Sequence, residues 1–283
     1  MKPAPFTYHR PAGLDEALDV LDQVGSDGKV LAGGQSLLPL LSMRLAAPAH
    51  LVDVNHLPGL DVVEVTADVV RCGALVRHTD LLRHPAAFDA QPLLRRALQH
   101  VAHPTIRNRG TTVGSICHAD PAAEMPAVTL LLGGTLVVRS RRGERRIAAA
   151  DLFAGPLETT LATDELAVAV EWPVTAPRES TAIVEVSRRH GDYAVCGVAA
   201  QVRVDEDGTV RAARAVYVSM GLTPPVLDLT GAVAGQHVER ADWAGAAALA
   251  TEQLEPEADI HASADYRRHL AGVLTRRAFE EAG

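Results

Sequence analysis

Two glycine-containing stretches hold the residue types best suited to binding a phosphate group. The first, LAGGQSLLPLLSMRL (31–45), places Gly33 and Gly34 between a short apolar run and a segment with helical spacing. The second, HPTIRNRGTTVGSICHADPAAEMP (103–126), mixes glycine with threonine and serine ahead of a histidine, an aspartate and a glutamate. Small side chains leave successive backbone N–H groups uncovered, and such groups form a concave nest that binds an anion. We therefore expect a phosphate-binding loop in each stretch.

The position of the two stretches indicates what kind of ligand they would share. They lie far apart in a chain of net charge −8, so a bound phosphate would have to be held by local geometry. Two nests acting from both sides fit a ligand with two adjacent phosphates, which points to a dinucleotide. The first loop lacks both the G-x-G-x-x-G spacing and the Gly-Lys-Ser/Thr of a P-loop, which excludes Rossmann and Walker binding. By itself, Gly33-Gly34 is also a common dipeptide in turns between regular elements.

The acidic residues after the second glycine stretch have two interpretations. Asp120 precedes Pro121, which predicts a helix N-cap followed by proline at the first helical position. Glu124 falls in the first turn of the same expected helix, where the helix dipole favours a carboxylate. A capping role does not prevent Asp120 from also facing a ligand.

The composition restricts the classes of function. The chain has 283 residues, of which 47% are apolar, 22% charged and 4% aromatic, so it is long enough for two or three packed units. The net charge of −8 argues against sequence-independent binding to nucleic acid, which requires a basic field. The N-terminus has no apolar signal region, and no stretch reaches about 18 uninterrupted apolar residues. We expect a cytoplasmic protein without a transmembrane segment.

The residues that support hydrolysis or metal catalysis are not arranged for it. Cys72, Cys117 and Cys196 are too few and too widely spaced for a disulfide framework, a zinc ribbon or an iron–sulfur ligand set. The chain has neither a Ser/His/Asp order nor a His-x-x-x-His pair, and its 12 histidines are scattered. We expect no metal site, so redox chemistry would need an organic cofactor or a partner protein.

Hydrophobic periodicity places the first glycine stretch at the end of a strand. LDEALDVLDQV (14–24) has apolar positions at helical spacing, and residues 29–32 read as a strand that runs directly into the glycines. A short helical pattern follows Ser36, and HLVDVN (50–55) is the next expected strand. Ligands bind at the carboxyl ends of strands in sheets that include helices, because free backbone groups point out of the sheet there.

Two further units follow the first. Their expected elements, in chain order, are strands at 61–65 and 69–76, helices at 93–101 and 126–134, strands at 135–140, 145–149 and 166–173, two alternating strands joined at Asp207-Gly208, and helices at 241–254 and 265–281. The period of two at the start of this region predicts that an antiparallel pair opens the second unit.

Several segments together resemble one protein family. The signature segments of the FAD-binding medium subunit of molybdenum hydroxylases are similar, in chain order, to AGGQSLLP with the following MRL, IRNRGTTVGSICHADPAAE, GPLETTL, RRHGDYA and ADYRRHL. The family includes subunits of the carbon monoxide, nicotine and xanthine dehydrogenase types, and the resemblance covers essentially the whole chain. It implies an α+β fold. A two-subdomain FAD-binding fold of the vanillyl-alcohol oxidase/p-cresol methylhydroxylase type (1–57 and 58–176) would precede a C-terminal α+β domain of antiparallel sheet and helices (177–283).

The resemblance implies FAD as the cofactor and assigns phosphate-binding residues. The pyrophosphate would lie against Ala32, Gly33, Gly34, Gln35 and Ser36 of the first stretch and Thr111, Thr112, Val113, Gly114 and Ser115 of the second. Side chains at positions 33 and 34 would hold the phosphates off the amides. The family more often has His in place of Gln35 and Gly in place of Val113, so Val113 would bring a β-branched side chain beside the phosphates.

Further cofactor positions carry over from the same resemblance. They are Asp120, Glu124 facing the ribityl hydroxyls, Leu161 meeting the isoalloxazine ring, and Arg188, Arg189 and Tyr193 beside the flavin. Tyr193 would cover one face of the ring and control what reaches it, and one of the two arginines would tune the redox potential through its charge. On pattern alone, Leu161 is a core leucine and Tyr193 a strand tyrosine.

The function implied by the resemblance is electron transfer. Substrate would be hydroxylated at the molybdenum cofactor of a separate large subunit, and electrons would cross a [2Fe–2S] small subunit to the FAD of this chain. The flavin would pass them to NAD, a quinone or oxygen, and the three subunits would form a heterotrimer. The alternatives are a free-standing FAD-dependent oxidoreductase on the same fold and a non-catalytic subunit in which FAD is structural or absent.

Overall fold

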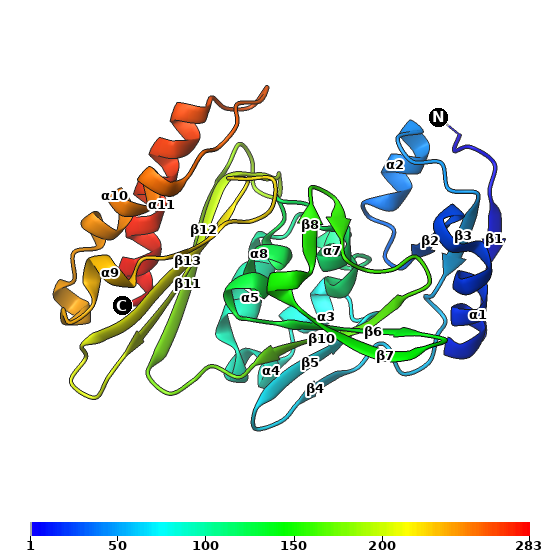
Figure 1. Ribbon diagram of the computed structural model, residues 1–283, viewed down its shortest axis with the longest axis horizontal. Helices are drawn as coiled ribbons and strands as arrows, with labels where there is room; N and C mark the ends of the chain where they lie inside the picture. Colours follow the sequence, from blue (N-terminus) through cyan, green and yellow to red (C-terminus); the bar gives the residue numbers. More distant parts are fainter. Residues whose placement is uncertain (1) are drawn as a thin grey trace.

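A computed structural model describes residues 2–283, which form three main sheets with helices between and outside them (Figure 1). The units follow one another along the chain and also in space. The N-terminal unit lies at one end of the molecule and the C-terminal helices lie at the other. The mixture of helices and largely antiparallel sheet is the expected α+β class.

The first unit is a small parallel sheet with two helices. Its elements are β1 (Thr7–His9), α1 (Leu14–Val24), β2 (Gly28–Leu31), α2 (Leu37–Met43) and β3 (His50–Asp53), in the strand order β1-β3-β2. Helix α1 forms over the predicted residues because Ala17, Leu18 and Leu21 share one face and bury it. The same core includes Val137 and Ala169 from the second unit. The first two units are therefore held together by shared apolar packing.

The second unit is built on a five-stranded antiparallel sheet in the order β4-β5-β10-β6-β7. Its elements are β4 (Val63–Val65), β5 (Val69–Gly73), α3 (His78–Leu82), α4 (Pro85–Ala90), α5 (Pro92–His100), α6 (Pro104–Arg107), α7 (Thr112–His118), α8 (Glu124–Leu131), β6 (Thr135–Ser140), β7 (Gly143–Ala148), β8 (Phe153–Gly155), β9 (Glu158–Thr159) and β10 (Leu166–Pro173). Strands β8 and β9 form a separate hairpin. The buried Trp172 of β10 donates from Nε1 to Thr129 Oγ1 of α8 at 3.2 Å, which ties this helix to the sheet.

The third unit is a four-stranded antiparallel sheet covered by helices. Its elements are β11 (Glu179–Ser187), β12 (Ala194–Val204), β13 (Val210–Val218), β14 (Val226–Asp228), α9 (Thr230–Val233), α10 (Trp243–Gln253) and α11 (Ala264–Ala282). Helices α9–α11 lie on one face, while α5 and α8 of the second unit lie toward the other (Figure 1). We predicted an alternating strand for β12, but Val198 packs toward one core and Ala199 toward the other. Its centre is buried on both faces, so its sequence is continuously apolar.

Candidate functional site

The first glycine stretch leaves the carboxyl end of β2 as a loop and enters α2. Gly34 has a φ of +71°, a left-handed conformation that glycine adopts without strain. Within residues 2–283, the backbone N–H groups of Gly33, Gly34, Gln35 and Ser36 donate to no other protein group. The Gln35 side chain donates from Nε2 to the Gly33 carbonyl oxygen at 2.9 Å, so its amide supports the loop itself. Four consecutive uncovered N–H groups supply the donors of an anion-binding nest.

The second glycine stretch enters a helix where we expected an open loop. Thr111 is the N-cap of α7, and its Oγ1 accepts a hydrogen bond from the Gly114 N–H at 3.1 Å. Val113 is only 2% exposed and packs in the core of the second unit. The prediction that the Val113 side chain lies beside a phosphate is therefore wrong, because the first turn of α7 directs this side chain inward.

The two glycine stretches are in backbone contact at Gly33. A Cβ atom added to Gly33 would lie 2.4 Å from the carbonyl oxygen of Arg109 and 2.7 Å from the Cα of Gly110. Real Cβ atoms do not approach other atoms this closely, so residue 33 must be glycine for the two backbones to meet. The sequence alone suggests the close approach of phosphates as the reason for glycine at position 33. The structure adds the backbone of the second stretch as another reason.

Asp120 caps a turn instead of the helix that we predicted after it. Its Oδ1 accepts from the Ala122 N–H at 2.8 Å, and α8 begins only at Glu124. The turn also reaches the third unit, since the Ser219 N–H donates to the Pro121 carbonyl oxygen at 2.9 Å. The expected Asp-Pro helix start is wrong because these residues connect α7 to α8, two helices that pack together.

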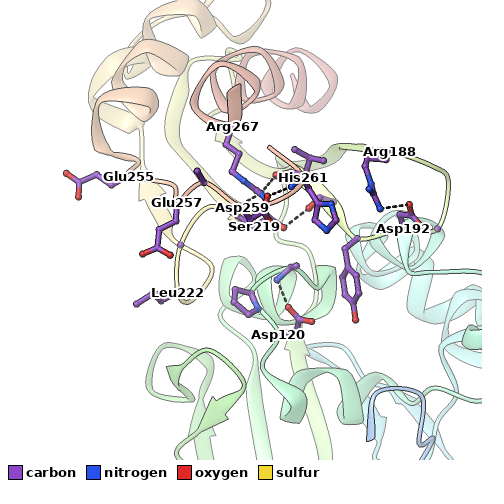
Figure 2. Close-up of a pocket in the computed structure, with 18 residues that line it drawn as sticks. Asp120, Arg188, Asp192, Ser219, Leu222, Glu255, Glu257, Asp259, His261 and Arg267 are labelled. Carbon is purple, nitrogen blue, oxygen red and sulfur yellow. Dashed lines mark hydrogen bonds and ion pairs between the residues drawn. The ribbon is translucent and has the colours of Figure 1, made fainter. Parts of the chain in front are cut away.

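A cavity of about 620 Å³ lies between this turn and the third unit. Three of the predicted site residues line it, namely Asp120, Arg188 and Tyr193. Arg188 forms an ion pair with Asp192 at 3.7 Å, and Arg267 of α11 forms another with Asp259 at 2.6 Å (Figure 2). The structure thus places Gly33 and Thr111 at the contact between the glycine stretches, and Asp120, Arg188 and Tyr193 at this cavity.

The residues expected beside the flavin differ in their exposure. The Tyr193 side chain is 65% exposed, and the pKa of its hydroxyl is raised by partial burial of the oxygen and by the carboxyl groups of Asp120 and Glu124. Arg189 lies in a turn, where its carbonyl oxygen accepts from the Asp192 N–H at 3.0 Å. Leu161 is half-buried against the core of the second unit. Tyr193 therefore has an aromatic face free to cover a ligand.

Glu124, at the start of α8, is a buried carboxyl group. Burial, together with the nearby carboxylate of Glu185 on β11, raises its pKa to about 8. One oxygen of Glu185 lies 3.3 Å from Nδ1 of His100, and the other has no hydrogen-bond partner among the described residues. The raised pKa favours the neutral form of this carboxyl group near neutral pH. In that state it can donate as well as accept a hydrogen bond with a ligand hydroxyl.

Replacing Glu124 with glutamine is expected to remove a pH dependence from the stability of the flavin-free protein. Folded Glu124 keeps its proton up to about pH 8. An unfolded glutamate loses its proton near pH 4.3. The contribution of Glu124 to the free energy of unfolding is therefore largest in acid and falls by about 1.4 kcal/mol per pH unit between these two values. Denaturant unfolding at a series of pH values from 5 to 8 measures the slope.

The matched control for this substitution is Glu252→Gln, which changes an exposed glutamate on α10. Its unfolding free energy should follow the wild-type slope, whereas that of Glu124→Gln should be flatter and higher at pH 8. If the unfolding free energies of Glu124→Gln and wild type changed with pH at the same rate, Glu124 would ionise normally in the folded chain.

Two residues that join the glycine stretches were not identified from the sequence. Asn55 Nδ2 donates to the carbonyl oxygen of Ala32 at 2.8 Å, and Arg77 Nη2 donates to Asn55 Oδ1 at 2.8 Å. Arg77 Nη1 also donates to the carbonyl oxygen of Arg109, at 2.7 Å. The position of Asn55 at the end of an expected strand was a usable signal. No sequence pattern marked Arg77.

Two family models match the chain in succession. The FAD binding domain in molybdopterin dehydrogenase matches residues 4–175, and the CO dehydrogenase flavoprotein C-terminal domain matches residues 181–282. The chain belongs to the FAD-binding medium subunits of molybdenum hydroxylases. It is therefore an oxidoreductase subunit with FAD as its cofactor, and both the family and the cofactor predicted from the sequence are confirmed.

Individual relatives match this medium subunit over its whole length. The nicotine 6-hydroxylase medium subunit of Paenarthrobacter nicotinovorans is 40% identical over 285 residues, with 100% of this chain and 99% of the relative covered. Two solved structures, quinoline 2-oxidoreductase from Pseudomonas putida 86 and carbon monoxide dehydrogenase from Hydrogenophaga pseudoflava, each contain a chain that superposes with a TM-score of 0.93. Their identities are 38% and 34%, and the matches cover 100% of this chain and 98% of each of theirs. The expected α+β fold, with FAD-binding and C-terminal domains, is confirmed.

The residues of this medium subunit fit the cofactor of its family. The uncovered amides at residues 33–36 can donate to phosphate oxygens, and the contact at Gly33 brings the start of α7 next to them. Neutral Glu124 offers both a donor and an acceptor to a sugar hydroxyl.

Residues 2–283 contain neither a candidate metal site nor a candidate membrane span. In this part of the chain, no three His, Cys, Asp or Glu side chains lie close enough together to hold a metal ion. No helix in the same residues is both long enough and apolar enough to cross a membrane.

Proposed function

We propose that this chain is the electron-transfer subunit of a molybdenum hydroxylase and that it holds FAD between its two glycine stretches. The backbone contact at Gly33 carries the proposal, because it brings the uncovered amides of the first stretch next to the stretch that leads into α7. An anion held from both sides gains several charge-assisted hydrogen bonds. In this proposal residues 32–36 and 111–115 bind the pyrophosphate.

The other predicted residues take positions around the rest of the cofactor. Glu124 would hold the ribityl hydroxyls, Leu161 would pack against the ring system, and the exposed ring of Tyr193 would cover one face of it. Arg188 and Arg189 would place positive charge near the flavin and so favour its reduced, anionic form. Asp120 supports the turn that lines one side of the cavity.

Bound FAD supplies the redox chemistry, and the protein supplies position, shielding and electrostatics. The cysteine thiols are poorly suited to an additional redox role. Burial raises the pKa of the Cys117 thiol to about 12, so it stays protonated and unreactive at neutral pH. Cys72 and Cys196 are buried as well.

The proposed partners are a [2Fe–2S] small subunit, which donates electrons to this chain, and a large subunit with the molybdenum cofactor. Relatives carry the names medium subunit and medium chain, which supports a heterotrimer. The terminal acceptor would be NAD, a quinone or oxygen. Three relatives are named for nicotine, caffeine and quinoline, so a substrate panel for the assembly starts from these compounds.

We also propose three domains, at residues 1–57, 58–176 and 177–283. Each main sheet lies wholly within one of these segments, which supports the division. The three free cysteines support a cytoplasmic location, since that compartment keeps thiols reduced. The net charge of −8 supports small-molecule and protein partners over nucleic acid.

A second candidate function is a free-standing flavoenzyme that oxidises a small substrate itself. The cavity of about 620 Å³ beside Tyr193 favours it, because small-molecule sites commonly have such volumes. A substrate seated there would lie next to the residues assigned to the flavin.

The flavin of the purified chain is expected to accept and release electrons without its partners. Dithionite should bleach the flavin absorbance under anaerobic conditions, and a benzoquinone should restore it.

Acid precipitation should release FAD into the supernatant, because no His or Cys has been assigned a linking position. Free FAD at the same concentration is the control. A bound flavin that dithionite or quinone cannot reach would indicate a structural cofactor, and flavin in the pellet would indicate a covalent link.

A further inference from the structure

A hydrogen-bonded cluster fixes the first glycine stretch at the carboxyl edge of its sheet. Asp53, at the end of β3, accepts hydrogen bonds from the Tyr8 hydroxyl and, through Oδ1, from the Asn55 N–H at 2.9 Å. Asn55 Nδ2 donates to the same Oδ1 at 2.6 Å and to the carbonyl oxygen of Ala32 at 2.8 Å. These bonds hold the Asn55 side-chain amide in one orientation, and they leave Asn55 Oδ1 free to accept from another residue.

Arg77 supplies that donor from the second unit. Its Nη2 donates to Asn55 Oδ1 at 2.8 Å, and its Nη1 donates to the carbonyl oxygen of Arg109 at 2.7 Å. The segment that carries Arg77 is itself bonded to the second glycine stretch, since the His78 N–H donates to the carbonyl oxygen of Gly110 at 2.9 Å. One guanidinium group therefore links both stretches through their backbones.

This link is the only direct hydrogen-bonded connection between the two sides among the described residues. Within residues 2–283, no other hydrogen bond joins residues 31–36 or 53–55 to residues 76–79 or 108–115. The contact at Gly33 limits how closely the two stretches approach, but van der Waals contact has little directional preference. Hydrogen bonds to a planar, always charged guanidinium do fix distance and angle.

A diphosphate held from both sides needs both sets of amides at hydrogen-bond distance at the same time. A site that already has this spacing binds more tightly, because ordering is not paid for during binding. We propose that Asn55 and Arg77 are positioning residues that fix the spacing of the two glycine stretches and thereby set the affinity for a diphosphate ligand. This inference rests on the proposed binding of FAD between the stretches. It predicts that the pair affects any ligand with that diphosphate.

The test measures ligand affinity and folding separately on the full chain after removal of flavin. Arg77→Met and Asn55→Ala should each weaken FAD about ten- to hundredfold, which corresponds to about 1.4–2.8 kcal/mol. ADP, measured by competition with FAD, should weaken by the same factor because it carries the same diphosphate. The double variant should bind FAD no more weakly than the single variant with the lower affinity, since the two residues act as one link. The thermal midpoint of the flavin-free chain should stay unchanged.

Two further variants separate positioning from general damage. Thr79→Ala removes a hydrogen bond from Thr79 Oγ1 to Asn108 Oδ1, 2.7 Å long, that lies wholly within the second unit. It should keep wild-type affinity for FAD. Arg77→Lys keeps the charge but loses the planar fork, so its affinity should fall between those of wild type and Arg77→Met. Together with Arg77→Met, the variants Thr79→Ala and Arg77→Lys keep the test decisive even where Asn55→Ala fails to fold.

The outcomes distinguish this inference from the proposed function. Absence of FAD binding by the wild-type chain would refute the proposed function. Wild-type FAD affinity in Arg77→Met would refute only the positioning role, as would a loss for FAD that ADP does not share. Affinity losses that add in the double variant, together with a lower thermal midpoint, would assign the two residues to general stability and overturn the inference.

Discussion

Replacing Gly33 with alanine is expected to abolish FAD binding while the flavin-free chain stays folded. The added Cβ atom would meet the carbonyl oxygen of Arg109 at 2.4 Å, so the two glycine stretches must separate. A separated site loses two or more charge-assisted hydrogen bonds of about 1.5–3 kcal/mol each, which weakens FAD about a hundred- to ten-thousandfold. Folding should survive because Gly33 lies outside the three apolar cores. Flavin fluorescence titration and circular dichroism measure the two effects.

Two other glycine substitutions in the same unit serve as graded controls. Gly34→Ala forces alanine into a left-handed conformation at φ +71°, which costs about 1–2 kcal/mol, and its Cβ atom would meet only side-chain atoms of leucines at distances of 3.1 Å or more. Its loss of affinity should be smaller. Gly13→Ala places its Cβ atom where nothing lies within 4 Å, so affinity should match wild type. If Gly33→Ala bound FAD as tightly as Gly13→Ala, the contact between the stretches would not position the cofactor.

The isolated chain is expected to bind FAD without oxidising the substrate of the assembly. In the proposed function the molybdenum cofactor and the [2Fe–2S] cluster belong to the large and small subunits, so oxidation of the substrate requires those partners. Substrate-dependent dye reduction should stay at background for the chain alone. It should rise to full turnover when the chain is co-expressed with the genes for the small and large subunits.

The design of this experiment separates absence of activity from absence of flavin. The isolated chain should carry FAD and, once reduced with dithionite, should itself reduce the dye, which shows that its flavin is competent. The assembly containing Gly33→Ala should lose electron transfer to acceptors that react at the flavin. Substrate oxidation by the metal-free chain at the rate of the assembly would overturn the electron-transfer proposal in favour of a free-standing flavoenzyme.

The elements with strong local signals could be predicted from the sequence alone. Helix α1 occupies the predicted residues because its apolar residues repeat with the helical period, and strands β6 and β10 do so because they are short apolar runs bounded by glycine, proline or polar residues. Helix α7 could not be found in this way. Its first turn, Thr-Val-Gly-Ser, consists of poor helix formers, and the burial of Val113 and Ile116 in the second core stabilises it instead. Tertiary packing overrode local propensity there.

The sequence determined which residues belong to the glycine stretches, while the tertiary structure decided what each one does. Glycine at position 33 was visible as a requirement, but the backbone that passes beside it comes from Arg109 and Gly110, far along the chain. Asn55 and Arg77 link the stretches through hydrogen bonds across 22 to 32 residues. Local patterns carry no record of such partners, because distances between remote backbone atoms are set only when the separate sheets pack against a shared core.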